Sequence, residues 1–367
     1  MYVVCNSYHI SSKPKGNCIR EYISNRASDN LKGHNIILWI SHILITICFV
    51  SCSPDFPKPS VSFYYWKTEF KLSKKEEAVL KDNQVNKLYV RYFDVGLKDK
   101  SPIPIALINF IEKPKIAVIP VVYIKNKVLL EQIDIRKLAK DILTLVYNTS
   151  VKQNITYNQL QLDCDWTLNT KSSFFKLIKH CKELSKKEIT STIRLHQVKH
   201  SAKTGIPDVN KGVLMYYNMG KIAADSLNSI YERDIAIRYI QALKRYPLEL
   251  NVALPIYNWG VHIRENKVIG LLNKINLKHF LSDTSFKVLQ TNLITAKRNI
   301  LKAGYFFKKG DNIKIEAIKK VDIEEMIDDL SYHMNIPPKE IIFFDLDDHN
   351  LDEYNYGQAF QKLCNSF

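Results

Sequence analysis

Short apolar runs of strand length recur along the chain after residue 60 and alternate with stretches of helical pattern. Each run is rich in β-branched and aromatic residues, as buried strands are. The runs cover residues 61–66, 87–93, 116–124, 159–165, 190–196, 212–218, 250–257 and 341–346. Apolar residues at helix spacing predict helices from about residue 73, over 135–146 and 174–181, and around 229–245 and 284–302.

Eight strands separated by helices predict βαβ units and a parallel sheet. Over residues 61–367 this number suits a single (β/α)8 TIM-barrel-like domain of the α/β class, typically about 250 residues before insertions. Two stretches depart from this alternation of strands and helices. Residues 97–112, after the second strand, contain Pro102 and Pro104 and lack a clear helix, and residues 259–272, after the seventh, have the pattern of an inserted hairpin. A doubly wound open sheet is the alternative, but no glycine-rich phosphate loop follows any strand.

The apolar stretch at residues 36–50 has the length of a signal-peptide core. It is about 15 residues long, whereas a helix that crosses a bilayer core needs about 20. Phe49-Val50-Ser51-Cys52 follows and resembles the lipobox of bacterial lipoproteins, with Phe where Leu is usual. We therefore expect residues 1–51 to be a signal peptide, with an N-terminal extension from a start codon placed too far upstream. Cys52 is then the lipidated residue, and the proline-rich residues 52–60 form a tether.

A lipid anchor at Cys52 implies a protein of the cell envelope. Ser53 stands where some bacteria use Asp to retain lipoproteins in the inner membrane, so the outer membrane is favoured. The net charge of +16 falls to about +13 without residues 1–51, but the lysines are scattered. An exported protein rarely meets nucleic acid, so the expected membrane contact is through the anchor and no nucleic-acid partner is expected. The cysteines beyond Cys52 have no metal-like spacing, and neither a metal nor a cofactor is expected.

Two neighbouring predicted strands carry the charged side chains that are candidates for chemistry. On the fourth strand, period-two alternation sends Asp163 and Asp165 to the barrel interior, with Asp165 nearer the carboxyl end. The fifth strand sends Arg194 and His196 to the same interior. Buried carboxylates are costly unless they are paired or functional, and barrel enzymes have their sites at this end. Asp163, Asp165 and His196 are therefore the candidate catalytic residues, with Arg194 a partner for Asp163 or a substrate-binding group.

Aromatic and amide side chains gather at other predicted strand ends. Sugars stack their C–H faces on aromatic rings and form hydrogen bonds with amides and carboxylates, so this combination favours a glycan over a small anion. The candidate substrate-binding residues, with Arg194, are Arg91, Trp66, Tyr216, Asn218, Tyr257 and Trp259.

Residues 160–167 (Leu-Gln-Leu-Asp-Cys-Asp-Trp-Thr) and 191–196 (Ser-Thr-Ile-Arg-Leu-His) support a family resemblance. They resemble the centre of an uncharacterised family of bacterial barrel-like domains, related to glycoside hydrolases and found in lipoproteins of Bacteroidetes-type bacteria. The resemblance implies a TIM barrel that acts on or binds a glycan. The fourth strand is also similar to the Asp-x-Asp pair of chitinase-type barrels, whose motif ends in a catalytic Glu. Thr167 stands at that position here, which weighs against a chitinase mechanism.

Three functions remain open at this point. The first is a glycoside hydrolase in which Asp163 and Asp165 form the acid/base pair. The second is a metal-dependent hydrolase with Asp163, Asp165, His196 and His200 as ligands, although no His-x-His or His-Glu-x-x-His motif is present. The third is a glycan-binding or envelope-assembly lipoprotein that has the barrel without the chemistry, since a fold does not by itself confer function.

The lipobox interpretation predicts a covalent modification at one residue. Labelled fatty acid should be incorporated into the wild-type protein expressed in a bacterial host, and Cys52→Ala should abolish the incorporation, because only that cysteine lies at the lipobox position. Gel fluorography of the two proteins measures the outcome. Continued labelling of Cys52→Ala would exclude Cys52 as the anchor.

Overall fold

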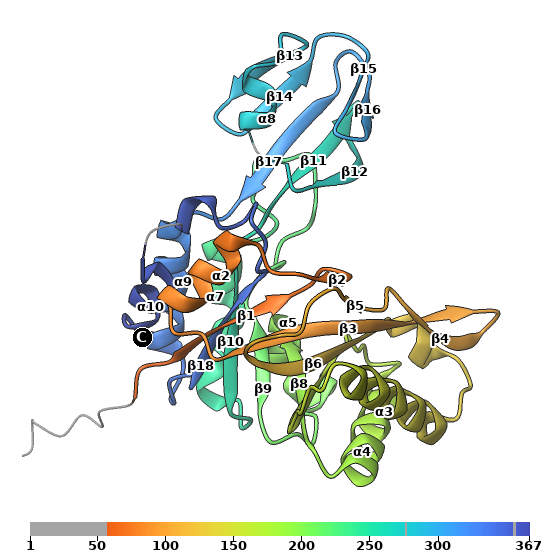
Figure 1. Cartoon of the computed structure of the whole chain (residues 1–367). Coiled ribbons are helices and arrows are strands. Elements are labelled where there is room, and N and C mark those ends of the chain that lie inside the picture. Colours follow the sequence, from red (N-terminus) through yellow and green to blue (C-terminus); the bar gives the residue numbers. More distant parts are fainter. Residues whose placement is uncertain (1–56, 276, 355–356) are drawn as a thin grey trace, which may run out of the picture. The chain divides into compact units, whose positions relative to one another are not determined.

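The eight strands expected from the sequence are all present, and they lie parallel in one closed sheet. The computed structural model describes residues 57–275, 277–354 and 357–367, and Pro57 to Phe367 form one unit. Cys52 and the expected signal peptide lie outside the described residues. The barrel strands are β1 (Ser60–Tyr65), β3 (Lys87–Lys98), β6 (Ala117–Ile124), β7 (Gln159–Asp163), β8 (Glu188–Arg194), β9 (Gly212–Met215), β10 (Leu250–Pro255) and β18 (Glu340–Phe344). They appear in Figure 1 with the helices outside them.

The first strand closes the barrel because it pairs on both sides. β1 forms parallel ladders with β18 on one edge and with β3 on the other, so the open-sheet alternative is wrong. Parallel pairing brings the carboxyl ends of all eight strands to one mouth. The predicted (β/α)8 TIM-barrel-like fold is thus confirmed.

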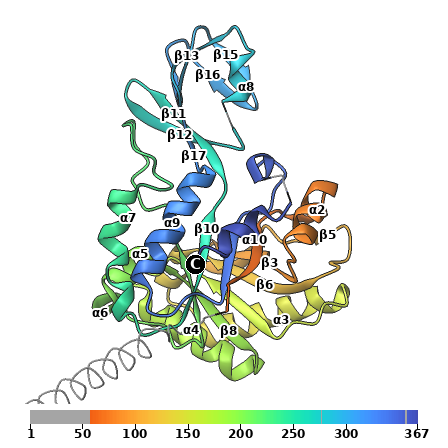
Figure 2. The ribbon, with the colours of Figure 1, turned by 90° about the vertical axis from the view of Figure 1, so that its left-hand side faces the viewer.

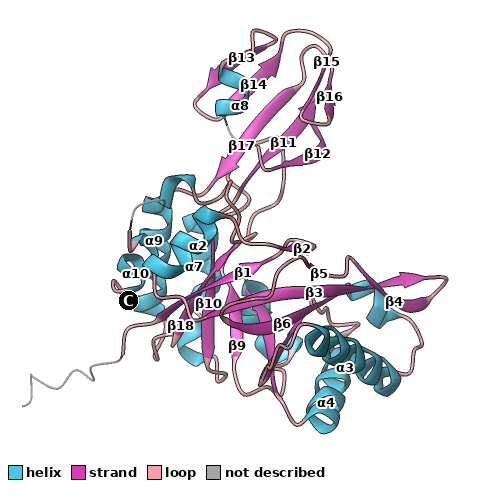
Figure 3. Ribbon diagram, viewed as in Figure 1, coloured by secondary structure: helices cyan, strands magenta, loops and turns pink. Residues whose placement is uncertain are grey.

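The helices cover the outside of the barrel, as Figure 3 shows by colour. Ser73 begins the first of them with a capping box, in which its side chain accepts from the Glu76 amide and Glu76 accepts from the Ser73 amide. Within the described residues, no helix is both long and apolar enough to span a bilayer. The helices outside the barrel are α2 (Lys74–Asp82), α3 (Ile135–Lys152), α4 (Lys171–Ser185), α5 (Leu195–Lys199), α6 (Ser201–Thr204), α7 (Arg233–Ile240), α9 (Lys320–His333) and α10 (Ala359–Cys364).

The irregular stretch after the second barrel strand is confirmed. β4 (Ser101–Ile105) runs antiparallel to β3 at the edge of the sheet, and no helix separates β3 from β6 among these residues. Pro102 and Pro104 fit an edge strand, where a missing N–H costs no ladder bond. Two short strands, β2 (Glu69–Phe70) and β5 (Asn109–Phe110), pair beside it.

The predicted hairpin after the seventh strand is part of a larger insertion. β11 (Asn258–Arg264) and β12 (Lys267–Asn273) form the hairpin. They continue through β17 (Asn312–Ala317), β14 (Leu293–Ala296) and β13 (Phe286–Gln290) into a five-stranded antiparallel sheet. The short helix α8 (Lys278–Leu281) and the hairpin of β15 (Ile300–Lys302) and β16 (Tyr305–Phe307) belong to the same insertion. Figure 2 shows this sheet extending away from one end of the barrel.

The helix predicted over residues 284–302 is wrong, because this stretch forms β13, β14 and β15. Its apolar residues recur at helical spacing, which produced the prediction. The strands form because Phe286, Ile294 and Ala296 are buried in a second hydrophobic core, and because β14 pairs with β17, which follows it within the same insertion. Long-range pairing has here overridden the local pattern.

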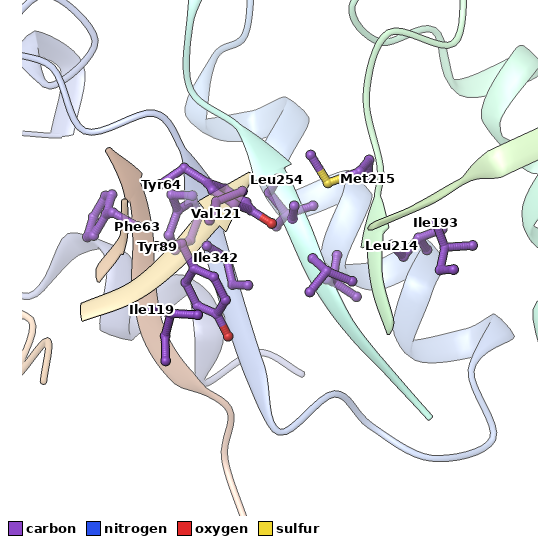
Figure 4. Close-up of a cluster of buried hydrophobic side chains, with 14 of the residues drawn as sticks. Phe63, Tyr64, Tyr89, Ile119, Val121, Ile193, Leu214, Met215, Leu254 and Ile342 are labelled. Atoms are coloured by element: carbon purple, nitrogen blue, oxygen red, sulfur yellow. The ribbon is translucent and has the colours of Figure 1, made fainter. Parts of the chain in front are cut away.

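Side chains alternate between the barrel interior and the surrounding helices. Leu160 and Leu162 are fully buried in the main hydrophobic core, while Gln161, between them, accepts a hydrogen bond from the Tyr64 hydroxyl across the interior at 2.7 Å. Gln161 therefore faces the interior, as the predicted alternation requires, although Asp165 lies beyond the end of β7. Figure 4 shows buried side chains of several barrel strands, among them Tyr89, Val121 and Ile342.

A buried carboxylate, Glu340, joins three further strands at the amino end of the barrel. Its Oε2 accepts from the Tyr89 hydroxyl at 2.9 Å and from the Asn251 amide at 3.2 Å, and lies 3.0 Å from Lys87 Nζ. The Ser62 hydroxyl donates to Oε1. The four donors come from three strands, with Lys87 and Tyr89 both on β3, so this carboxylate ties β1, β3 and β10 to β18.

Glu340→Ala should lower the free energy of unfolding by about 3–5 kcal/mol, because it leaves four buried or partly buried donors without their acceptor. Glu249→Ala is the matched control. Its side chain is 38% exposed and pairs with the 69% exposed Lys339, so its loss should cost at most about 1 kcal/mol. Denaturant unfolding measures both, and equal losses would show that the Glu340 network is not needed for barrel stability.

Candidate functional site

A cavity of about 540 Å³ opens at the carboxyl ends of the barrel strands. Its walls combine aromatic rings with carboxylate, amide and cationic groups from the barrel and from the insertion. The lining residues are Trp66, Lys67, Asp94, Tyr123, Asp163, Arg194, Met215, Tyr217, Asn218, Tyr257, Asn258, Trp259, Asn273, Lys274, Phe344, Asp345, Asp347 and Asn350. The mouth of the barrel is therefore hollow and chemically mixed, as binding sites commonly are.

Asp163, at the end of β7, lies in a buried polar cluster on one side of this cavity. The Thr192 hydroxyl donates to its Oδ1 at 2.7 Å, and Arg194 Nη2 lies 3.6 Å from the same oxygen. Burial raises the pKa of Asp163, although Arg194 and Thr192 oppose the shift. The expected pairing of Asp163 with Arg194 is thus present, and Thr192 is a partner supplied by the same face of β8.

Asp165 and His196 lie beyond the ends of their predicted strands. β7 ends at Asp163 and β8 at Arg194, so Asp165 follows the strand and His196 lies in α5. The Asp165 side chain is 49% exposed, and its Oδ1 accepts from Arg194 Nε. Asp165 and His196 line an adjoining depression of about 400 Å³, which shares Arg194, Tyr217 and Asn218 with the first cavity. Burial lowers the pKa of His196, with Asp165 opposing the shift. Arg194 therefore contacts both carboxylates, of which one is buried at the cavity and the other is exposed at the adjoining depression.

Aromatic rings form a continuous wall around Phe344. Its ring centroid lies 5.3 Å from that of Trp66, 5.5 Å from that of Tyr217 and 5.7 Å from that of Tyr257. The Trp259 ring follows, 5.5 Å from Tyr257. The Tyr257 hydroxyl donates to Asn218 Oδ1 at 2.5 Å, which fixes the edge of this wall.

The insertion holds Trp259 in place through a buried acid. Trp259 Nε1 donates to Glu316 Oε2 at 2.8 Å, and Glu316 also accepts from the Ser229 backbone amide and pairs with Lys314 at 2.7 Å. Glu316 is only 2% exposed. The insertion thus contributes a fixed aromatic side chain to the cavity.

Two of the predicted substrate-binding residues do not line the cavity. Tyr216 is buried and packs edge-on against Tyr231, at 6.2 Å between ring centroids, so its neighbour Tyr217 takes the place expected for it. Arg91 Nε lies 3.1 Å from Asp94 Oδ1, and the Arg91 guanidinium lies 5.6 Å from the centroid of the Trp66 ring. Arg91 therefore packs against an aromatic residue of the wall. A register shift after Arg91 in the β3–β6 ladder accompanies this arrangement.

Sequence reasoning missed the acids that follow the eighth strand. Asp345 and Asp347 both line the cavity. The signal was present, because Asp345-Leu346-Asp347 repeats the Asp-x-Asp spacing of the fourth strand at the same end of the barrel. Lys67 and Lys274 carried no such signal, since they lie in connections whose path depends on the insertion and the loops.

The described residues around the cavity do not provide a set of ligands for a metal ion. Among the described residues, no group of three or more His, Cys, Asp or Glu side chains is arranged to hold a metal ion. His200, the fourth ligand of the metal-hydrolase hypothesis, is exposed at the end of α5.

The two acids of the fourth strand should differ in their effect on stability. Asp163→Ala removes a buried partner of Arg194 and should lower the melting temperature clearly, by the equivalent of about 3–5 kcal/mol. Asp165→Asn, at the exposed position, should change stability by no more than about 1 kcal/mol. Thermal unfolding of both variants tests this, and the reverse order would mean that the structural role belongs to Asp165.

No family model matches the chain, and no curated protein matches it in sequence. In structure, the C-terminal domain of a putative chitinase from Desulfitobacterium hafniense is similar at 11% identity, over 84% of this chain and 99% of that domain, with a TM-score of 0.52. The Bacillus cereus spore cortex-lytic enzyme SleL matches at 11% identity over 85% and 75%, with a TM-score of 0.49. A GH18 chitinase from Cycas revoluta matches at 9% identity over 83% and 99%, with a TM-score of 0.47. The similarity to the Desulfitobacterium domain shows that the two chains share a barrel fold.

Proposed function

We propose that the barrel binds a glycan in the cavity at its mouth. The observation that carries this proposal is the wall formed by Trp66, Phe344, Tyr217, Tyr257 and Trp259, set among carboxylate and amide groups. Aromatic faces stack on the C–H faces of sugar rings, and the polar groups between them satisfy hydroxyls. The Desulfitobacterium domain of similar fold is described as part of a putative chitinase, and the proposal extends glycan recognition to this chain.

The charges in the cavity favour a neutral glycan. Lys274 pairs with Asp347 at 2.7 Å, Lys67 pairs with Glu76 at 2.5 Å, and Arg194 is engaged by Asp163 and Asp165. Because each of these three cations already has an acidic partner, an acidic sugar would have to displace one. A neutral sugar can use the free hydrogen-bonding capacity of the same groups without that cost.

Hydrolysis by Asp163 and Asp165 remains a proposal beside simple binding. Asp163 reaches the cavity, and Asp165 reaches only the adjoining depression. Arg194 contacts both, which suits a role in holding the cavity wall as well as a role in substrate binding. The alternative is therefore a glycan-binding or envelope-assembly protein without this acid/base pair, and the position of Thr167 in place of a catalytic Glu favours it.

We also propose that the domain acts at the cell envelope, held by lipid on Cys52. The support comes from the apolar residues 36–50 and the lipobox-like residues 49–52. A tether of residues 52–60 would allow the barrel to reach a glycan near the membrane surface.

Binding can be tested with four neutral tetrasaccharides, those of N-acetylglucosamine, glucose, xylose and mannose. At least one should bind, and Trp259→Ala should weaken its binding about tenfold or more, because the variant removes a stacking surface from the cavity. Tyr332→Ala is the matched control, since Tyr332 is 72% exposed and lies on α9 outside the barrel. Titration calorimetry gives the affinities, and thermal unfolding confirms that each variant is folded. Failure of all four sugars to bind would refute the proposal.

A further inference from the structure

Asp345 and Asp347 form a pair of acids in the cavity that is distinct from the Asp163 cluster. Both follow β18, which ends at Phe344, and both line the cavity beside the aromatic wall. Asp347 is buried and Asp345 is partly buried. Their two-residue spacing on the connection after a barrel strand brings two carboxyl groups to the place where a bound sugar would lie.

The two acids have different partners. Asp347 is held by cations, with Lys274 Nζ at 2.7 Å and Lys67 Nζ at 3.5 Å from its Oδ2. Asp345 accepts instead from a neutral amide, Asn350 Nδ2, at 2.6 Å. An acid paired with lysines keeps its charge, whereas an acid among aromatic rings beside a second carboxylate favours its neutral form.

The pKa values of the pair follow these contacts. Burial, and then the charge of Asp347, raises the pKa of Asp345 to about 6. Burial also acts on Asp347, but the hydrogen bond from Lys274 and the other favourable contacts outweigh it, so the pKa of Asp347 lies below its ordinary value. Two neighbouring carboxyl groups whose pKa values are driven apart are suited to act as an acid and a charged partner.

We propose that Asp345 is the proton donor, and Asp347 the charged partner, of a reaction that hydrolyses a neutral glycan bound in this cavity. This inference rests on the proposed function, because it requires the glycan to lie against the same wall. It adds a catalytic role for two residues outside the fourth and fifth strands.

The reaction needs only water as a co-reactant. The Asp345 carboxyl gives its proton to the glycosidic oxygen as the bond between that oxygen and the anomeric carbon breaks. The ionised Asp347 stabilises the positive charge that develops on the sugar. Water then adds to the anomeric carbon, and the proton that it loses returns to the Asp345 carboxylate, which restores the starting state.

The rate of glycan cleavage should depend on pH in one direction. Cleavage requires protonated Asp345, so it should be present below about pH 6 and fall as pH rises through that value. The ionisable groups that act on Asp345 include Asp347 on its own connection, Lys67 after β1, Lys274 after β12 and Tyr257 after β10. His349 lies on the same connection, where its backbone amide donates to Asp347 and its ring contacts Asn258. Across the cavity lie Asp163 and Arg194. The pKa values of Lys67 and Arg194 are raised above their ordinary values by their acidic partners, so these two groups keep their charge throughout this range.

The test uses the full chain, the same four tetrasaccharides and two matched variants. Asp345→Asn keeps an oxygen that can accept from Asn350 but has no acidic proton. Asp348→Asn changes an exposed acid on the same connection that does not line the cavity. Calorimetry measures binding, mass spectrometry measures cleavage between pH 4 and pH 8, and thermal unfolding shows whether each variant is folded.

Wild type and Asp348→Asn should cleave the bound sugar with the same acid-favoured profile, and Asp345→Asn should bind it while cleaving at least about 100-fold more slowly. Binding by the wild type without cleavage would overturn the inference and leave the proposed function standing. Cleavage by Asp345→Asn at the wild-type rate, or a wild-type rate that rises with pH through 6, would also overturn it. If no sugar binds, both the inference and the proposed function fail. Should Asp345→Asn not fold, the wild-type pH profile alone decides.

Discussion

The double pairing of β1 is the constraint on which the rest of this structure depends. Because β1 lies between β3 and β18, strands from the two ends of the domain become neighbours and every carboxyl end meets at one mouth. Glu340 reinforces this closure from inside, with donors from β1, β3 and β10. Only in a closed barrel do Trp66 after β1, Asp163 on β7 and Asp345 after β18 line one cavity.

Charge pairing then decides what each acid at the mouth can do. Arg194 contacts both Asp163 and Asp165, and Lys274 and Lys67 contact Asp347. Asp345 instead accepts a hydrogen bond from the Asn350 amide and lines the cavity together with the aromatic wall. Acids of the same chemical type therefore differ in their partners, and Asp345, whose pKa is raised to about 6, is suited to carry a proton.

The insertion after β10 forms part of the cavity wall. It supplies Trp259 and Lys274, and Glu316 holds the Trp259 indole from within the inserted sheet. This acid is buried and also receives Ser229 and Lys314, so the aromatic side chain has a fixed position before any ligand binds. Preorganised contacts of this kind favour binding because little freedom remains to be lost.

The sequence by itself determined the eight strands, the barrel, the inward face of Asp163 and Arg194, and several aromatic residues of the wall, because period-two alternation and strand spacing are local properties. It placed Asp165 and His196 in the interior as well, although their strands end two residues earlier. It predicted a helix over 284–302, where pairing with β17 produces strands. Only the tertiary structure decided the cationic partners of Asp347, since Lys67, Lys274 and Asp347 come together from segments far apart in the chain. Local pattern fixes the direction of a side chain on its strand, and the folded connections decide its partners.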